Sequence, residues 1–224
     1  MQDPAGNGVI RRFMESTHPA AVLARDIAWV AAVVGGVALV LFLASGTWPA
    51  VVAVESESMV PNMQVGDLVF VVAPDRFGAL QSWEEGEASG YAPFGTYPDR
   101  QGNMPYGDVI IYRPNGDTRV HPIIHRAISY ETGTDQGYVT KGDNNPAADQ
   151  NTYYPGIGYI RPVKKEWIVG KALFSVPLVG YLPLNIVPFA VLILLAVIIH
   201  ELLSRRKDEQ PPAPRSQHSG RKKR

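Results

Sequence analysis

The sequence predicts a mainly β domain flanked by two apolar helices, each long enough to cross a membrane. An uncharged run extends from Ile27 to Val54, and a second apolar stretch runs from about Leu184 to Leu203. Between them, short runs of β-branched and aromatic residues are bounded by Gly, Pro, Asn and Asp, a pattern typical of strands. The chain contains no cysteine, which excludes disulfides and thiolate chemistry.

The first apolar segment, residues 27–45, is predicted to be a transmembrane helix. It is rich in Val, Ala and Leu and carries no charge, and a helix of about 20 apolar residues crosses the hydrocarbon of a bilayer. A cleaved signal peptide is the alternative. It is disfavoured because the segment begins far along the chain, and because its apolar part is longer than the roughly 7–15 residues usual for such a peptide.

The second apolar segment, residues 184–203, is predicted to be another transmembrane helix. Pro183 and Pro188 lie near its start, and proline is tolerated in the first turn of a helix. His200 and Glu201 lie near its far end, where they are within reach of lipid head groups. A buried core helix is the alternative for this segment.

The basic residues outside the two apolar segments predict how the chain is oriented. Arg25 precedes the first segment and three basic residues, 205–207, follow the second. Positive charge favours the cytoplasmic side of a membrane. The sequence therefore predicts a multi-pass protein of the cell membrane with residues 1–26 and 204–224 in the cytoplasm and a central domain, residues 46–180, outside it. The basic, proline-containing tail is predicted to be disordered.

The charge of the central domain argues against a nucleic-acid partner. Residues 46–180 contain ten basic and fifteen acidic side chains, a net charge of −5, whereas the residues after Gly180 carry a net charge of +5. A domain that binds phosphates by its surface needs a basic face. We therefore expect no nucleic acid among the partners of this domain.

The central domain is predicted to consist of short strands, because no long stretch in it shows helical periodicity. Residues 74–105 are rich in Gly, Pro, Glu and aromatic side chains, and they are too many for a tight connection between strands. They are predicted to form a surface insertion or a lid. The strands are expected at Val65–Val72, Asp108–Tyr112, His121–Ile128, Gly137–Thr140 and Trp167–Val169.

Three side chains in the central domain provide the parts of a serine hydrolase. A serine hydroxyl is a poor nucleophile until a base takes its proton, and that base needs a partner to fix its tautomer. Ser58, His125 and an aspartate, Asp143 or Asp149, supply these types in that order. Each residue alone also fits a structural role, as a loop hydroxyl, a strand histidine or a turn residue.

Four motifs in order carry a resemblance to a known family. They are Ser56-Glu57-Ser58-Met59-Val60-Pro61, Gly107-Asp108-Val109-Ile110-Ile111-Tyr112, Pro122-Ile123-Ile124-His125-Arg126-Ala127-Ile128 and Thr140-Lys141-Gly142-Asp143-Asn144-Asn145. They resemble the type I signal peptidases of the archaeal and endoplasmic-reticulum branch, in which a histidine replaces the catalytic lysine of the usual bacterial branch. The likeness covers the first apolar segment and most of residues 46–175. It implies a membrane-anchored, mostly antiparallel β catalytic domain.

The resemblance implies a role for each residue of the site. Ser58 matches the nucleophile and His125 the general base. The family usually has a pair of aspartates after the Gly-Asp-Asn-Asn motif, and this chain keeps the second position as Asp149, with Ala148 in the first. Asp149 is therefore the first choice for the acid, and Asp143 is a supporting or alternative member.

The resemblance also implies what the site binds. Ser56 matches a position that helps to bind the oxyanion, although a turn hydroxyl is an equal alternative, and Met59 is assigned with it to substrate binding. The implied reaction is hydrolysis of precursor proteins after their signal peptides, which end in small residues. The implied partners are these precursors, the lipid bilayer and, as a further candidate, the protein-export machinery. No cofactor and no metal is expected.

Three other interpretations of the sequence remain open. A metal hydrolase would use His121 and His125, but the residues between them lack the Glu of a zincin motif. A serine–lysine pair with Lys141 as the base is chemically feasible. The non-enzymatic alternative is a membrane-anchored β module, or an inactive peptidase homologue, in an envelope complex.

Overall fold

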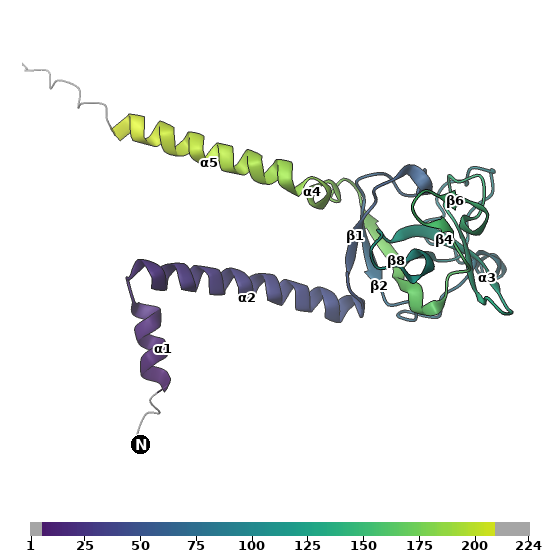
Figure 1. Ribbon diagram of the computed structural model, residues 1–224, viewed down its shortest axis with the longest axis horizontal. Helices are drawn as coiled ribbons and strands as arrows, with labels where there is room; N and C mark the ends of the chain where they lie inside the picture. Colours follow the sequence, from purple (N-terminus) through teal and green to yellow (C-terminus); the bar gives the residue numbers. More distant parts are fainter. Residues whose placement is uncertain (1–5, 209–224) are drawn as a thin grey trace, which may run out of the picture. The chain divides into compact units, whose positions relative to one another are not determined.

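The structure, a computed structural model, describes residues 6–208. Most of the tail that is predicted to be disordered, residues 209–224, lies outside the described residues. The chain divides into two compact units, residues 1–181 and residues 182–224. The first unit holds two helices and a β domain. Figure 1 shows the strands of that domain close together, and six of them form one sheet.

The β domain is built on a six-stranded antiparallel sheet. Its strand order is β1-β2-β8-β3-β4-β5, and β6 and β7 form a separate two-stranded sheet. This architecture confirms the predicted mainly β fold class. The strands are β1 (Val51–Ala53), β2 (Leu68–Val72), β3 (Val109–Tyr112), β4 (Ile123–Glu131), β5 (Gly137–Lys141), β6 (Tyr153–Tyr154), β7 (Gly158–Tyr159) and β8 (Ile168–Val176).

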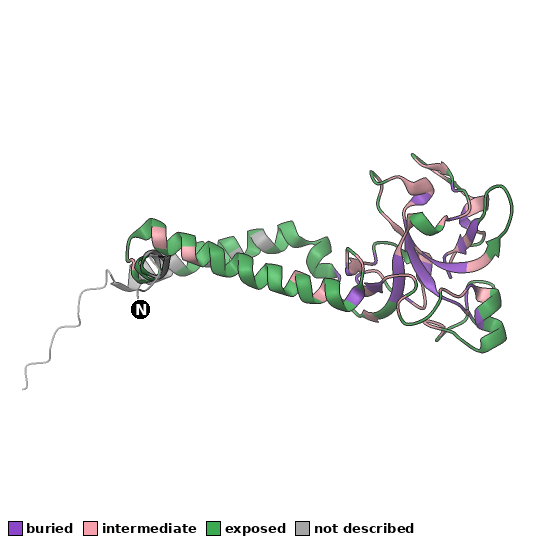
Figure 2. Cartoon of the chain, turned by 90° about the horizontal axis from the view of Figure 1, so that it is seen from below, coloured by how far each residue is buried: buried purple, intermediate pink, exposed green. Residues whose placement is uncertain are grey.

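The core lies on both faces of the sheet, as the alternation of side chains along β3 shows. Val109 and Ile111 pack into one apolar cluster, together with Met59 and Met63. Ile110 and Tyr112 point the other way into a second cluster. All four residues of β3 are fully buried, and the buried residues in Figure 2 follow the sheet through the domain. Because β3 is buried on both faces, the register of the strands that pair with it is fixed, and with it the face on which each of their side chains lies.

The insertion between β2 and β3 contains a short helix, α3 (Trp83–Ser89), that the sequence analysis did not predict. Ser82 caps its first turn: the Ser82 hydroxyl accepts from the Glu85 N–H, and the Glu85 carboxylate accepts from the Ser82 N–H. Ser-x-x-Glu is the signature of this capping box. Helix α3 makes contacts with β4, so the insertion is packed onto the sheet at this point.

The N-terminal part of the chain forms two helices, α1 (Gly6–Glu15) and α2 (Pro19–Ser45). Helix α2 begins earlier than the predicted residue 27, because His18 caps its first turn through Nδ1 and Pro19 occupies the first helical position. It ends at Ser45 and is followed by Gly46, whose φ of +73° favours glycine. Among the described residues, α2 is the one helix that is long and apolar enough to span a membrane.

The second unit contains most of the short helix α4 (Tyr181–Leu184) and all of α5 (Ile186–Asp208). The apolar part of α5, Ile186–His200, is shorter than the span predicted at residues 184–203. The two flanking transmembrane helices of the predicted fold class are therefore reduced to a single candidate, α2. The helix also continues to Asp208, so the first residues of the predicted tail are helical.

Candidate active site

Ser58 lies in a single turn of 3-10 helix, η1 (Glu57–Met59), shortly after β1. The Met59 side chain is buried in the core and anchors this turn, while Ser58 itself is half-buried. The Ser58 hydroxyl lies 3.2 Å from the hydroxyl of Ser56, which is exposed. The serine hydroxyl therefore lies at the surface, on a turn that the buried Met59 side chain anchors to the core.

Strand β4 sends two consecutive side chains to opposite faces of the sheet. His125 pairs with Ile110 of β3 and lies on the face of the second apolar cluster, whereas Arg126 pairs with Val109 and lies on the other face. Both side chains are buried. Strand β5 continues the pattern, because Thr140 pairs with Ala127 on the face of His125.

The carboxylate of Asp149 receives four hydrogen bonds beneath His125. Its Oδ2 lies 2.7 Å from His125 Nδ1, and it also accepts from the hydroxyls of Tyr112 (2.8 Å) and Thr140 (2.6 Å). Its Oδ1 accepts from the Tyr154 hydroxyl at 2.7 Å. Asp149 is fully buried at the start of η3 (Asp149–Asn151). A buried carboxylate needs such partners to remain charged.

These contacts keep Asp149 ionised. Burial alone would raise the pKa of the carboxyl, but the neighbouring His125 and the hydrogen bonds from His125, Thr140 and Tyr154 hold that pKa below its ordinary value of 3.8. Burial, together with the Asp149 charge, raises the pKa of Tyr112 and of Tyr154 above the ordinary value of 10.0. Both phenols therefore stay protonated and donate to the carboxylate.

The hydrogen bond from Nδ1 leaves the other nitrogen of His125 for chemistry. Nε2 lies beside Gly142: a Cβ at that position would be 2.9 Å from Nε2 and 2.5 Å from the carbonyl oxygen of Ser58. Position 142 therefore requires glycine, because any side chain there would push Ser58 and His125 aside. Backbone atoms of the Ser58 turn and the imidazole of His125 thus converge on one point.

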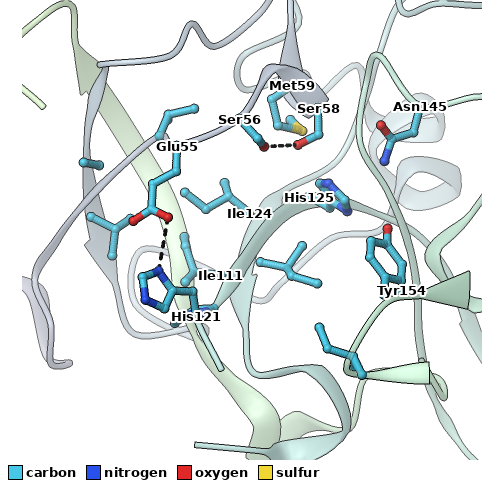
Figure 3. A pocket seen from close by; sticks show the side chains of 16 residues that line it. Glu55, Ser56, Ser58, Met59, Ile111, His121, Ile124, His125, Asn145 and Tyr154 are labelled. Carbon is cyan, nitrogen blue, oxygen red and sulfur yellow. Dashed lines mark hydrogen bonds and ion pairs between the residues drawn. The ribbon is translucent and has the colours of Figure 1, made fainter. Parts of the chain in front are cut away.

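Ser58 and His125 line the same pocket, of about 500 Å³ (Figure 3). One wall is the segment 52–59 and the other is the segment 121–125, with Asn145 and Tyr154 at one side. Much of the lining is aliphatic, from residues such as Val54, Ile111 and Ile124.

A polar contact between a histidine and a glutamate links the two walls at the rim of this pocket. His121 Nδ1 lies 3.1 Å from the Glu55 carboxylate, and both side chains are exposed (Figure 3). His125 has a separate carboxylate partner in Asp149. The two histidines thus have different neighbours, and no group of three or more His, Cys, Asp or Glu side chains able to hold a metal ion occurs within the described part of the chain.

Asp143 lies on the opposite face of the sheet from the imidazole and contacts a different residue. Its two carboxylate oxygens accept from Nε and Nη2 of Arg126, each at 2.9 Å, and both side chains are fully buried. Lys141, the base of the serine–lysine alternative, pairs with Arg126 in the sheet and donates to Asp99 and Gln101 of the insertion. The structure thus groups Asp149, and neither Asp143 nor Lys141, with His125.

Several residues of this site were not predicted from the sequence. Tyr112, Thr140 and Tyr154 come from separate strands, and no local pattern shows that their hydroxyls converge on one carboxylate. Arg126 did have a signal: an arginine inside the apolar run Ile-Ile-His-Arg-Ala-Ile is expected to have a buried partner, because this residue type is rarely buried without one.

Comparisons with known proteins give the site a context. No protein-family model matches the chain. The signal peptidase complex catalytic subunit of Schizophyllum commune is 32% identical over 149 residues, which is 58% of this chain and 61% of that protein. The subunit of Sclerotinia sclerotiorum is 30% identical over 142 residues, 63% of this chain and 66% of the relative. That of Yarrowia lipolytica is 39% identical over 85 residues, 38% of this chain and 47% of the relative.

The chain thus spans between about half and two thirds of the length of these curated relatives. All three carry the name of the catalytic subunit whose family the four motifs resemble. The resemblance is confirmed, and this chain is a homologue of signal peptidase catalytic subunits.

Proposed function

We propose that this chain is a membrane-bound serine endopeptidase that removes N-terminal signal peptides from exported proteins. The observation that carries the proposal is the pocket lined by Ser58 and His125, in which Asp149 binds the far nitrogen of the imidazole. A serine, a histidine and a carboxylate in this order activate a hydroxyl that is otherwise a weak nucleophile. The names of the relatives support the same activity.

In the proposed reaction, the Ser58 hydroxyl attacks the carbonyl carbon of the scissile bond and passes its proton to Nε2 of His125. The imidazolium then donates this proton to the leaving amine, and the signal peptide stays on Ser58 as an ester. Water attacks the ester with His125 again as base, and the imidazolium returns the proton to the departing Ser58 oxygen, which restores the hydroxyl and releases the signal peptide with a free carboxylate. Asp149 stays ionised and stabilises the imidazolium in both steps.

Ser56 and Met59 shape the rest of the proposed site. The Ser56 hydroxyl, 3.2 Å from that of Ser58, is a donor for the oxyanion together with the Ser58 backbone N–H. Met59 is almost entirely buried and also lines the pocket, so its role is to form a wall against which small substrate side chains pack. An extended substrate lies between the walls of residues 52–59 and 121–125.

Replacement of the nucleophile tests the activity. The full-length protein in lipid is expected to cleave a precursor with an Ala-x-Ala site, and Ser58→Ala is expected to abolish this cleavage, because no other group in the proposed reaction can form the ester. Cleavage is measured by gel shift, and the new N-terminus of the product by mass spectrometry.

Thr47→Val is the matched control for the loss of a hydroxyl, because Thr47 donates to the Val169 carbonyl and does not line the pocket. It is expected to cleave like the wild type. Full activity in Ser58→Ala would overturn the enzyme proposal.

We also propose that α2 anchors the protein in the cell membrane and that a second span follows the β domain, with residues 46–180 outside the cytoplasm. The exposed apolar surface of α2 supports its role as a membrane anchor. The basic residues 205–207 support the orientation, because positive charge favours the cytoplasmic side. The substrates are then precursors held at the same membrane, which raises their local concentration at the site. The names of the relatives refer to a complex, and we propose that accessory subunits or export machinery are partners of this chain too.

The orientation is tested with a protease added to sealed cells. Cleavage is expected within residues 74–105, which are accessible in the outer domain, while a tag fused after Arg224 is expected to be protected. Immunoblots for the two ends report the result, and permeabilised cells, in which both sites become accessible, are the control. Protection of the insertion with loss of the tag would reverse the proposed topology.

A further inference from the structure

The insertion between β2 and β3 reaches the loop that follows β5. Two consecutive residues of the insertion bind three consecutive carbonyls of that loop: the Arg100 N–H donates to Asp143 at 2.8 Å, its guanidinium to Asn144 at 3.4 Å, and the Gln101 side chain to Asn145 at 3.2 Å. These bonds therefore fix the backbone of loop residues 143–145 against the insertion.

The same loop holds the turn that carries the serine. The Asn144 backbone N–H donates to the carbonyl of Ser58 at 2.8 Å, and the Asn144 side chain donates to the carbonyl of Glu57 at 3.1 Å. Gly142, at the start of the loop, lies against both Nε2 of His125 and the carbonyl of Ser58. The position of this loop thus sets the distance between nucleophile and base.

Asn62 joins the insertion, the loop and the serine turn. It follows η1 in the chain by three residues, and its Nδ2 donates both to the Tyr97 carbonyl (3.0 Å) and to Asp143 Oδ2 (2.9 Å). Its Oδ1 accepts from the Tyr97 N–H at 2.9 Å. Both N–H groups of the amide and its oxygen are therefore in use, and a carboxylate at this position could keep the contact of the oxygen but not the two donated bonds.

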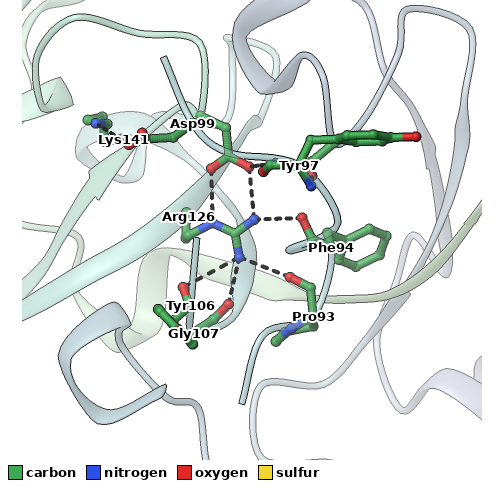
Figure 4. A network of polar contacts seen from close by, with 10 residues as sticks. Pro93, Phe94, Tyr97, Asp99, Tyr106, Gly107, Arg126 and Lys141 are labelled. Atoms are coloured by element: carbon green, nitrogen blue, oxygen red, sulfur yellow. Dashed lines mark hydrogen bonds and ion pairs between the residues drawn. The ribbon is translucent and has the colours of Figure 1, made fainter. Parts of the chain in front are cut away.

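The other end of the insertion is held by the buried guanidinium of Arg126 (Figure 4). It donates to the carbonyls of Pro93, Phe94, Tyr106 and Gly107, and also to the carboxylate of Asp143. The backbone of Phe94 has a φ of +54°, which is strained for this residue type and is maintained by its surroundings. The insertion is thus fixed at its base and extends to the loop as a defined structure.

We propose that Asn62 and the segment 97–101 of the insertion form a clasp that positions Ser58 and His125 for catalysis. The inference rests on the proposed function, since it assigns a role in the same reaction. The clasp residues do not line the pocket, so they act through the loop 142–145 and are positioning residues. A shift of about 1 Å in reacting groups costs about 10²-fold in rate, so a clasp of this kind affects turnover more than substrate binding.

Asn62→Asp is the sharpest test, because it keeps the size of the side chain and the acceptor for the Tyr97 N–H. It replaces the Nδ2 donor by an anionic oxygen that faces Asp143 Oδ2 and the Tyr97 carbonyl. The variant of the full-length protein in lipid is expected to lose about 10- to 100-fold in kcat on the Ala-x-Ala precursor, with KM changed by no more than about twofold.

Gln64→Glu is the matched control. It makes the same amide-to-acid change two residues further on, where the side chain is exposed and donates to the Pro61 carbonyl, and it is expected to leave kcat unchanged. Asn62→Ala, which removes the bonds without adding a charge, provides a second variant if Asn62→Asp does not fold. A wild-type kcat in both Asn62 variants, or a raised KM at constant kcat, would overturn the clasp.

Hydrogen exchange measures the clasp independently of activity. The amides of Asn144 and Asn145, which are bonded to the Ser58 and Gly142 carbonyls, are expected to exchange faster in Asn62→Asp than in the wild type and the Gln64→Glu control. Unchanged exchange would overturn the inference. An inactive wild-type protein would count against the proposed function, and the exchange of these two amides would still decide whether the clasp exists.

Discussion

Asp149→Asn is expected to reduce the rate of precursor cleavage by about 10⁴, the loss found when the carboxylate of a serine protease triad is replaced by its amide. The amide presents a donor or a neutral acceptor to Nδ1 of His125, so the imidazole takes the wrong tautomer. It also has one acceptor oxygen for the hydroxyls of Tyr112, Thr140 and Tyr154, which all donate to the carboxylate. Single-turnover cleavage of an Ala-x-Ala precursor measures the loss, and circular dichroism checks the fold.

Asp143→Asn is the matched variant, because it makes the same change in a buried carboxylate that binds Arg126 and not His125. It is expected to cost less activity than Asp149→Asn. The reverse order would make Asp143 the acid of the site. Equal and mild effects of the two substitutions would mean that Ser58 and His125 act as a pair without a carboxylate.

Arg126→Met is expected to destabilise the β domain by about 3–5 kcal/mol, the usual cost of removing one partner from a buried ion pair. The substitution leaves the Asp143 carboxylate buried without its cation, and four backbone carbonyls of the insertion lose their donor. Urea unfolding of the full-length protein in detergent, followed by tryptophan fluorescence, measures the change.

The double variant Arg126→Met/Asp143→Leu controls for the uncompensated charge. It removes both members of the pair, so it is expected to be more stable than Arg126→Met alone. A loss below about 1 kcal/mol in the single variant would contradict the prediction and would mean that water reaches Asp143 when the guanidinium is removed.

Local patterns predicted the strands, but some strand ends were misjudged where a turn or a distant contact determines them. Strand β2 starts at Leu68 instead of Val65, because a turn in which the Asp67 N–H bonds the Gln64 carbonyl precedes it. Strand β8 continues to Val176, well past the predicted end at Val169. It passes through Lys171, a charged residue that is buried because it reaches the carboxylate of Asp108 from a distant part of the chain.

Two further elements were missed for different reasons. Strand β1, residues 51–53, lies inside the uncharged run that extends to Val54, and composition alone does not show where a membrane helix ends and a strand begins. The αL glycine at position 46 marks that boundary. Helix α3 did have a local signal, the Ser82-x-x-Glu85 capping box, within a segment that was treated as irregular.

The candidate site was predictable to the extent that motifs carry it. Ser58 and His125 stand in recognisable motifs, and the choice of Asp149 over Asp143 rested on the resemblance, since both aspartates follow the same strand. The alternation of β4 and β5 adds the physical reason. His125 and Thr140 lie on the same face of the sheet and both bind Asp149. Arg126 lies on the other face and binds Asp143. This pairing depends on register, which the sequence does not reveal.

The four hydrogen bonds to Asp149 have a consequence for the response to salt. Three donors converge on Oδ2 of Asp149 and one reaches Oδ1, so protein groups supply the hydrogen bonds that water gives to an exposed carboxylate. The group is sealed from solvent, so counter-ions cannot screen its charge as they screen exposed charges. The remainder of the domain carries a net negative charge that faces solution. Ionic strength is therefore expected to act on the proposed encounter between the protein and a precursor, and to leave the polarisation of His125 unaffected.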